Sequence, residues 1–305
     1  MSEYPILDSD RYLVLLNPNA AGGQSEVLSR RIAGAMASHR VHFDIVETKS
    51  VEHGLRVVRA AVEANCRAVV AAGGDGTIAM ALRGAAGSEV PVALLPFGTG
   101  NQLALNFGVP VSLEDSVRVA VEGVVERIDL GRIGDEYFAL IAGAGLDAEV
   151  MASATSELKS RLGVLAYLVG GIKHVITPSR TRYRIEADDE EIEIEASMVL
   201  LANAGLIGAG GLPVELKVGP RTSFQDGLLD VAIFAPRHLP DMAAMLTRVA
   251  LHRYSGDDRM IFLQARRVRV EADPPVAAQI DGEPRGVTPI TAEIDPLAGR
   301  ILVPR

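Results

Sequence analysis

The stretch Val69–Ile78 constrains the fold more than any other part of the sequence. Small apolar residues over Val69–Ala72 predict a buried strand, which ends on Gly73 and Gly74 before a helical pattern begins after Asp75. Such a turn directs unpaired backbone N–H groups to one point, which suits a phosphate. A carboxylate beside a phosphate requires a cation between them, so Asp75 favours a Mg²⁺-nucleotide site. An ordinary Gly-Asp turn explains the stretch equally well.

Strands and helices alternate over the first part of the chain. This order predicts an α/β domain with a parallel sheet and helices on both faces. Ligands on such sheets gather at the carboxyl ends of the strands, and here every predicted strand end carries glycine, asparagine or threonine. The predicted strands are Tyr12–Leu16, His42–Val46, Ala68–Ala72 and Val92–Leu95, and the predicted helices are Ser25–Ala37 and Ser50–Ala64.

After about residue 126 the pattern changes to a β-rich domain, which we expect to be antiparallel and sandwich-like. We therefore expect two domains, residues 1–126 and 127–305, and the sequence leaves open whether the last strand returns to the first domain. Two hairpins are predicted, Ile128–Ile133 with Tyr137–Ile141 and Arg182–Ala187 with Glu191–Ser197. Further strands are predicted at Leu229–Phe234, Val268–Glu271, Ala277–Ile280, Thr291–Ile294 and Ile301–Val303, with helices near Glu157–Ile176 and His238–Leu251.

Charge and cysteine content exclude several classes of function. The chain carries 30 Lys and Arg against 39 Asp and Glu, and this net charge of −9 argues against nucleic acid as the main partner. A single cysteine permits neither a disulfide framework nor a Cys/His metal cluster. The N-terminus has no signal-peptide pattern, and the apolar run Ala196–Val214 contains Asn203, Pro213 and several glycines, which predicts a strand and a loop. We expect a cytoplasmic protein.

Two further Asp-Gly turns contain paired acids. Asp226 and Asp230 flank a glycine turn that starts a strand, and Asp281 precedes Glu283 by two residues. In extended chain, residues 281 and 283 point to the same side, so their carboxylates could share one cation. Solvated turn chemistry is the simpler interpretation of either motif alone.

Taken in series, these motifs resemble those of the diacylglycerol kinase catalytic-domain family, which includes bacterial lipid kinases and the sphingosine kinases. The resemblance extends from about Tyr12 to the end of the chain. The motifs are Asn17-Pro18 with Gly22-Gly23, Gly73-Gly74-Asp75-Gly76-Thr77, Pro96-Phe97-Gly98-Thr99-Gly100-Asn101, Asp226-Gly227-Leu228-Leu229-Asp230 and Asp281-Gly282-Glu283.

The resemblance implies a nucleotide domain, a β-rich lipid-substrate domain and an active site in a cleft. It implies a general base at Asp281, with Glu283 beside it and Asp75 in a magnesium network. It implies a structural Mg²⁺ held by Ser223, Asp226 and the carbonyl group of Leu228. The implied nucleotide-binding residues are Asn17, Thr48, Gly73, Gly74, Asp75, Gly76, Thr77, Gly98, Thr99 and Asn101.

We therefore interpret the chain as an ATP- and Mg²⁺-dependent lipid kinase that phosphorylates a hydroxyl of a long-chain lipid, either diacylglycerol or a sphingoid-like lipid. Its partners would be ATP and a lipid at the inner membrane face, where the protein would act peripherally in phospholipid biosynthesis, and a homodimer is left open. Gln102 departs from the aspartate of several bacterial diacylglycerol kinases, which weakens diacylglycerol as the specific substrate. The alternatives are a soluble kinase of the NAD-kinase architecture and a non-catalytic nucleotide- or lipid-binding regulator.

Overall fold

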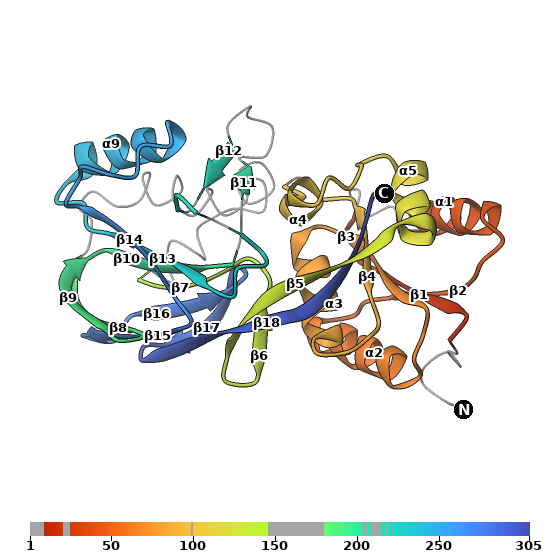
Figure 1. Ribbon diagram of the computed structural model, residues 1–305. Helices are drawn as coiled ribbons and strands as arrows, with labels where there is room; N and C mark the ends of the chain where they lie inside the picture. The colour runs from red at the N-terminus through yellow and green to blue at the C-terminus, as the bar shows by residue number, and fades with distance from the viewer. Residues whose placement is uncertain are drawn as a thin grey trace. The chain divides into compact units, whose positions relative to one another are not determined.

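The computed structural model describes residues 9–20, 25–98, 100–145, 180–203, 206–208, 215–217, 219–221 and 223–305. The chain divides into two compact units (Figure 1). Unit 1 comprises Met1–Ile128 and Leu297–Arg305, and unit 2 comprises Asp129–Pro296. Two strands, β5 (Val124–Ile133) and β18 (Ile290–Val303), run from one unit into the other.

Unit 1 is built on a parallel sheet, as the sequence predicts. The strands lie in the order β2, β1, β3, β4, and the end of β18 joins beyond β4, where Ile301 pairs with Val92. Buried runs such as the one from Leu13 to Leu16 form these strands because both faces of the sheet are covered. The strands are β1 (Arg11–Leu16), β2 (His42–Glu47), β3 (Ala68–Gly73) and β4 (Val92–Pro96).

Helices cover the two faces of this sheet (Figure 1). Leu28, Ile32 and Val117 pack from α1 and α5 onto the face that includes Val14 and Val70. The opposite face is contacted by α2 and α3. The helices are α1 (Ser25–Ser38), α2 (Val51–Glu63), α3 (Asp75–Ala85), α4 (Gln102–Asn106) and α5 (Leu113–Glu122).

Unit 2 is a sandwich of two antiparallel layers. One layer has the strand order β14-β13-β10-β7-β16-β17, and the other contains β9, β8, β15 and the first part of β18, with the hairpin of β5 and β6. Side chains from both layers, including Val199, Val231, Tyr183 and Val270, form one core. The strands are β6 (Glu136–Phe138), β7 (Ile141–Ala144), β8 (Thr181–Ala187), β9 (Glu190–Ala196), β10 (Met198–Ala202), β13 (Leu229–Phe234), β14 (Met260–Ala265), β15 (Arg267–Asp273), β16 (Ala277–Ile280) and β17 (Glu283–Val287). Beside the sandwich lie β11 (Leu206–Gly208), β12 (Glu215–Lys217) and helix α9 (Leu239–Ala250).

Two predicted strands differ in the structure. The segments Thr291–Ile294 and Ile301–Val303 belong to one strand, β18. The strand continues through Pro296 and Gly299, with Leu297 between them at a φ of 57°. The predicted strand Tyr137–Ile141 is divided between β6 and β7, since the N–H groups of Ala139 and Leu140 bond to a side chain. The helix predicted near Glu157–Ile176 lies outside the described residues.

In the part of the chain that the structure describes, no helix combines the length and the apolar character needed to cross a bilayer.

Candidate active site

The carboxyl ends of β1, β3 and β4 lie level with one another in unit 1. Leu16 pairs with Ala72, and Gly73 pairs with Pro96, so the loops that follow the three strands leave the sheet at one edge. Parallel sheets bind their ligands at this edge. The residues predicted to contact a nucleotide are therefore drawn from loops that are neighbours in space.

Asn17 connects the first of these loops to helix α3. Its backbone N–H donates to the carbonyl oxygen of Ala72 at 3.0 Å, and its Nδ2 donates to Thr77 Oγ1 at 3.3 Å. Thr48 follows β2 and donates its N–H and its Oγ1 to the carbonyl oxygen of Leu16, at 2.9 and 3.4 Å. The structure thus places Asn17, Thr48 and Thr77 along the same edge.

The glycines of this edge fall into two kinds. A Cβ on Gly73 would lie 2.4 Å from Thr77 Oγ1, and a Cβ on Gly98 would lie 2.6 Å from the Cα of Gly74, so the two loops touch through their backbones. The fold itself requires glycine at these positions. A Cβ on Gly76, in the first turn of α3, would meet no atom of the described residues within 4 Å, apart from its chain neighbours and the backbone of its own helix. The fold does not require glycine there, and the open space faces solvent.

Asp75 joins two of the loops. Its Oδ1 accepts a hydrogen bond from the backbone N–H of Leu103 at 3.2 Å, which ties the start of α3 to α4. Asn101 has a φ of 47° and closes the intervening loop through two hydrogen bonds with the backbone of Gly98, at 3.0 and 2.8 Å. Thr99 lies outside the described residues.

Gln102, which departs from the aspartate of the family pattern, contributes a hydrogen bond to this loop. Its side chain is buried, and its Nε2 donates to the carbonyl oxygen of Gly100 at 3.2 Å. A carboxylate at this position could not donate that bond. Gln102 therefore supports the same loop that Asn101 closes.

In unit 2, Asp281 and Gly282 form the two-residue turn between β16 and β17. Their φ values are 47° and 85°, and Ile280 pairs directly with Glu283. Two positive φ values are typical of the tight turn that Asp-Gly favours. The expectation of an extended chain from 281 to 283 is therefore wrong, because a turn residue does not follow the alternation of a strand.

The Asp281 carboxylate accepts three consecutive backbone N–H groups. Its Oδ2 accepts from Ala139 at 2.9 Å, and its Oδ1 accepts from Leu140 at 2.9 Å and from Ile141 at 3.0 Å. The backbone N–H of Asp281 donates in return to the carbonyl oxygen of Ile141 at 2.8 Å. Such charge-assisted bonds fix the turn firmly on the segment between β6 and β7.

Asp188 uses its side chain in a similar way, at a position where no site was predicted. It has a φ of 50° in the turn between β8 and β9, and its carboxylate accepts the N–H groups of Arg266 and Arg267 at 2.9 Å each. A turn aspartate that caps a neighbouring strand is thus a structural device of unit 2. Any catalytic role of Asp281 must be additional to it.

Glu283 faces a guanidinium group. Arg285 Nη2 donates to Glu283 Oε2 at 2.8 Å, and Arg285 Nε donates to Glu136 Oε2 at 2.6 Å. The pKa of Arg285 is raised because the hydrogen bonds and charges of both glutamates outweigh its partial burial. The acid predicted beside the base therefore has a protein cation as a partner.

The loop that precedes β13 contains the residues predicted to hold a structural Mg²⁺. Ser223 Oγ accepts the N–H of Gln225 at 3.1 Å. Asp226 Oδ1 accepts the N–H of Leu228 at 3.1 Å, and its Oδ2 accepts Gln264 Nε2 at 3.2 Å. A hydroxyl, a carboxylate and a carbonyl are gathered within this one turn, and oxygen ligands of this kind are those that Mg²⁺ prefers.

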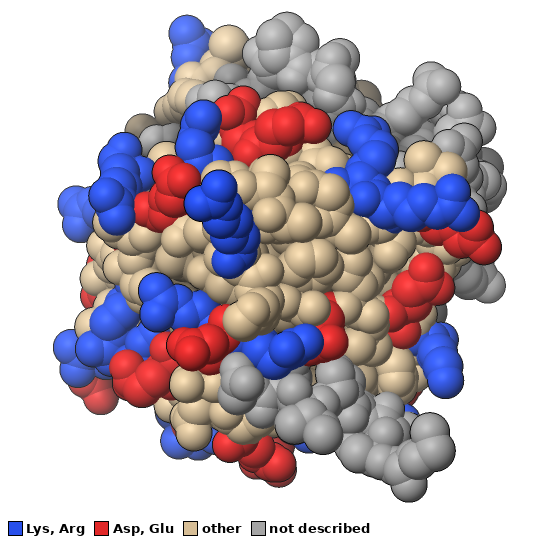
Figure 2. Space-filling model, turned by 90° about the vertical axis from the view of Figure 1, so that its right-hand side faces the viewer, with Lys and Arg blue, Asp and Glu red and all other residues tan. Residues whose placement is uncertain are grey.

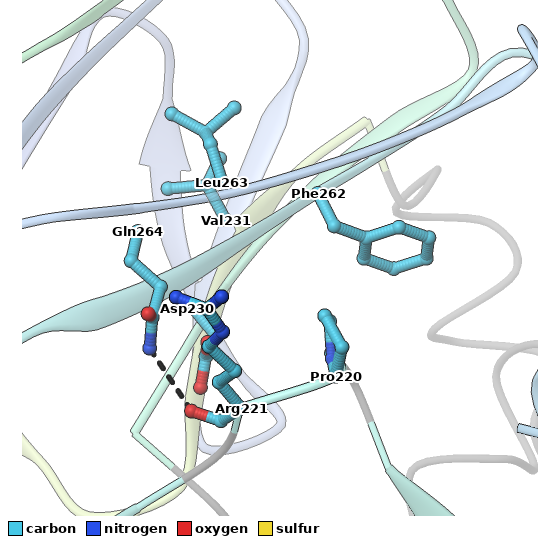
Figure 3. Close-up of a pocket in the computed structure, with 8 residues that line it drawn as sticks. Pro220, Arg221, Asp230, Val231, Phe262, Leu263 and Gln264 are labelled. Atoms are coloured by element: carbon cyan, nitrogen blue, oxygen red, sulfur yellow. Dashed lines mark hydrogen bonds between the residues drawn. The ribbon is translucent and has the colours of Figure 1, made fainter. Parts of the chain in front are cut away.

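A second carboxylate, Asp230, lines a cavity of about 250 Å³ (Figure 3) and is close enough to Asp226 to interact with its charge. Burial and the negative charge of Asp226 raise the pKa of Asp230 to about 7, while a hydrogen bond from Gln264 opposes the shift. Among the described residues, neither acid forms an ion pair with Lys or Arg. A cation at this loop would relieve the repulsion between them, so the donor set fits Mg²⁺. The cavity is lined by Gly219, Pro220, Arg221, Asp230, Val231, Phe262, Leu263 and Gln264.

Across the described ranges, no group of three or more His, Cys, Asp or Glu side chains could hold a metal ion. The set predicted at this loop therefore combines carboxylates with the Ser223 hydroxyl and the Leu228 carbonyl.

Two buried polar residues, absent from the sequence-based assignment, connect the parts of unit 2. Asp129 Oδ2 accepts the N–H of Gly227 at 2.7 Å, beside the predicted metal ligands. Asn203 Nδ2 donates to the carbonyl oxygens of Asp129 at 2.7 Å and Ala139 at 3.2 Å. In the sequence, each of these residues is visible only as a polar residue within or beside an apolar strand. Its hydrogen-bond partners are distant in sequence, so its role could not be predicted from the local pattern.

Comparison with known proteins identifies both units. Residues 11–133 match the model of the diacylglycerol kinase catalytic domain, and residues 141–303 match that of the YegS C-terminal NAD kinase beta sandwich-like domain. A protein of Bacillus subtilis named "Diacylglycerol kinase" is 32% identical over 72% of this chain and 72% of its own length. A protein of Pseudomonas aeruginosa PAO1 named "Probable lipid kinase YegS-like" is 30% identical over 98% of this chain and 96% of its own.

Solved structures agree on the fold. A crystal structure of a diacylglycerol kinase from Bacillus anthracis superposes with a TM-score of 0.79 at 22% identity, over 96% of this chain and 97% of that one. The matched domains, the relatives and the five motifs in series lead to one conclusion: the chain belongs to the diacylglycerol kinase catalytic-domain family of lipid kinases.

Proposed function

We propose that this lipid kinase transfers the γ-phosphoryl group of ATP to a hydroxyl of a long-chain lipid, either diacylglycerol or a sphingoid-like lipid, and that it depends on Mg²⁺. The observation that carries the ATP assignment is the open space over Gly76. A helix N-terminus with a glycine that the fold does not require leaves room and N–H groups for phosphate.

Phosphoryl transfer depends on positioning and charge neutralisation more than on covalent assistance. Bound Mg²⁺ would supply part of that neutralisation. The edge loops of unit 1, with Asn17, Thr48 and Gly73–Thr77, would hold the triphosphate, and Asp75 would keep the loops around it in place. The lipid oxygen would bond to the γ-phosphorus as the bond to the ADP oxygen breaks.

The proton of the lipid hydroxyl would pass to Asp281. Its carboxylate is held in place by three backbone N–H donors, and a carboxylate fixed in this way can serve as a general base. Glu283, two residues further along the chain, would support this step.

A long-chain substrate requires access to a membrane surface. On the face of unit 1 shown in Figure 2, basic and acidic side chains surround an uncharged central area. Interspersed charges create no strong field of one sign over the visible part of this face. Docking of unit 1 through this face would therefore depend on its uncharged residues more than on a charge of one sign.

The function is tested with labelled ATP and a total lipid extract. We expect a labelled product that partitions into chloroform and requires Mg²⁺. A product found only in the aqueous phase, such as a phosphorylated dinucleotide, would support the NAD-kinase-like alternative. Tight ATP binding without turnover on any lipid would support the non-catalytic regulator.

Gly76→Ala tests the phosphate position. A methyl group in the open space should lower ATP affinity at least about tenfold, or about 1.4 kcal/mol. The fold should not suffer, since alanine in a helix is about 0.5–1 kcal/mol more favourable than glycine. Gly34→Ala is the matched control, because Gly34 lies in helix α1 and its Cβ position is also open. If calorimetry gave equal ATP affinity for the Gly76→Ala and Gly34→Ala variants, the phosphates would have to bind at a position other than the space over Gly76.

Asp226→Asn tests the cation site beside Asp230. The change keeps an oxygen for the N–H of Leu228 and removes the repulsion between the two acids. We expect the melting temperature without Mg²⁺ to stay at or above that of the wild type, and the rise on adding Mg²⁺ to disappear. The melting curves with and without Mg²⁺ decide this, and an undiminished rise would exclude Asp226 as a ligand.

Asp281→Asn tests the base, with Asp188→Asn as the matched structural control. Both changes weaken the capping of backbone N–H groups, so we expect both to lower the melting temperature. Only Asp281→Asn should lower kcat, by about a hundred- to ten-thousandfold. Comparable kcat in the two variants would show that Asp281 is a structural cap and not the base.

A further inference from the structure

The β16–β17 hairpin is attached to the segment 136–141 at two places. At one end, the Asp281 carboxylate accepts the N–H groups of Ala139, Leu140 and Ile141. At the other end, Arg285 Nε donates to Glu136 Oε2 at 2.6 Å. Three residues lie between Asp281 and Arg285, and two lie between Glu136 and Ala139, the first of the N–H donors. The two attachments therefore hold the β16–β17 hairpin and the segment 136–141 together over a short length of chain.

Arg285 also bonds to Glu283 at 2.8 Å, so one guanidinium bridges two carboxylates. The three side chains are partly shielded, with exposed fractions of 29% for Arg285, 38% for Glu283 and 45% for Glu136. A guanidinium can make these bonds together because its N–H groups form a planar fork. A lysine ammonium is a point charge and would not hold both acids in this geometry.

We propose that Arg285 and Glu136 are positioning residues for the site at the 281–282 turn. The bridge Glu136–Arg285–Glu283 fixes the segment 136–141 against the hairpin, and this segment carries the N–H groups that orient Asp281. The bridge also sets the direction of the Glu283 carboxylate. This inference rests on the proposed function, in which Asp281 accepts the proton.

Arg184 provides a matched control within unit 2. It too lies between two glutamates, at 2.8 Å from Glu191 and 3.7 Å from Glu186, but on strand β8 and half-exposed. Exposed ion pairs of this kind contribute little to stability. Its replacement should therefore leave the 281–282 turn and the reaction unchanged.

The first test measures backbone hydrogen exchange in Arg285→Met, Glu136→Gln, Arg184→Met and the wild type. In the first two variants we expect the amides of residues 139–141 to exchange at least about tenfold faster, because the bridge no longer limits local opening. Arg184→Met should match the wild type. Unchanged protection in both Arg285→Met and Glu136→Gln would overturn the proposal.

The second test measures kcat and the KM for ATP on the lipid that the wild type phosphorylates. We expect kcat to fall about tenfold or more in Arg285→Met and in Glu136→Gln, since small displacements of reacting groups are costly, while the KM for ATP changes less than about twofold. The double variant should lose little beyond either single one, because the two residues form one bridge. Arg285→Lys should resemble Arg285→Met.

Each outcome distinguishes the two claims. Faster exchange with an unchanged kcat would reduce the bridge to a structural role, and full activity in Arg285→Lys would show that only the charge matters; either result overturns the positioning role. A wild type that phosphorylates no lipid would overturn the proposed function. In that case the exchange measurement still decides whether the bridge holds segment 136–141.

Discussion

Three hydrogen bonds from consecutive backbone N–H groups to one carboxylate organise the candidate site of unit 2. They explain why the chain leaves β6 in one layer and enters β7 in the other, since Ala139 and Leu140 direct their N–H groups to Asp281 at the switch. Asn203 holds the carbonyl side of the same segment, and Asp129 continues the connection to the loop around Asp226. The predicted base and the predicted metal loop are thus parts of one polar network.

Unit 1 depends on a different constraint, the close approach of two glycine loops. Gly74 and Gly98 meet backbone to backbone, and Asp75 and Asn101 each fix one side of that contact. These contacts hold the described parts of the two loops together. Preorganisation of this kind lowers the entropic cost of binding a flexible triphosphate.

The sequence predicted much of unit 1 for physical reasons. Apolar runs such as Leu13–Leu16 can only be buried strands, and level strand ends follow from a parallel sheet, so the convergence of Asn17, Thr48 and Gly73 was foreseeable. Residue patterns also identified the sandwich. They could not reveal that β18 continues through Pro296 and Gly299, because the pairing of Ile301 with Val92 depends on a distant part of the chain.

The site in unit 2 was less predictable. The Asp-Gly dipeptide indicated a turn, but the donors to Asp281 lie 140 to 142 residues away, where local patterns carry no information. The shared guanidinium of Arg285 and the raised pKa of Asp230 likewise arise from packing between strands. The sequence motifs were enough to select the acidic residues of the site. Which side chains and N–H groups each acid contacts is determined by the fold.

The final strand has a consequence for how the protein is made. Strand β4 pairs on one side with β3 and on the other with the end of β18, which emerges after all of unit 2 has been synthesised. Until then, this side of β4 lacks the strand that pairs with it at Val92, and an uncovered strand edge can pair with strands from other chains. Unit 1 is therefore most exposed to aggregation on the ribosome, and residues 1–128 expressed alone would retain that exposed edge permanently.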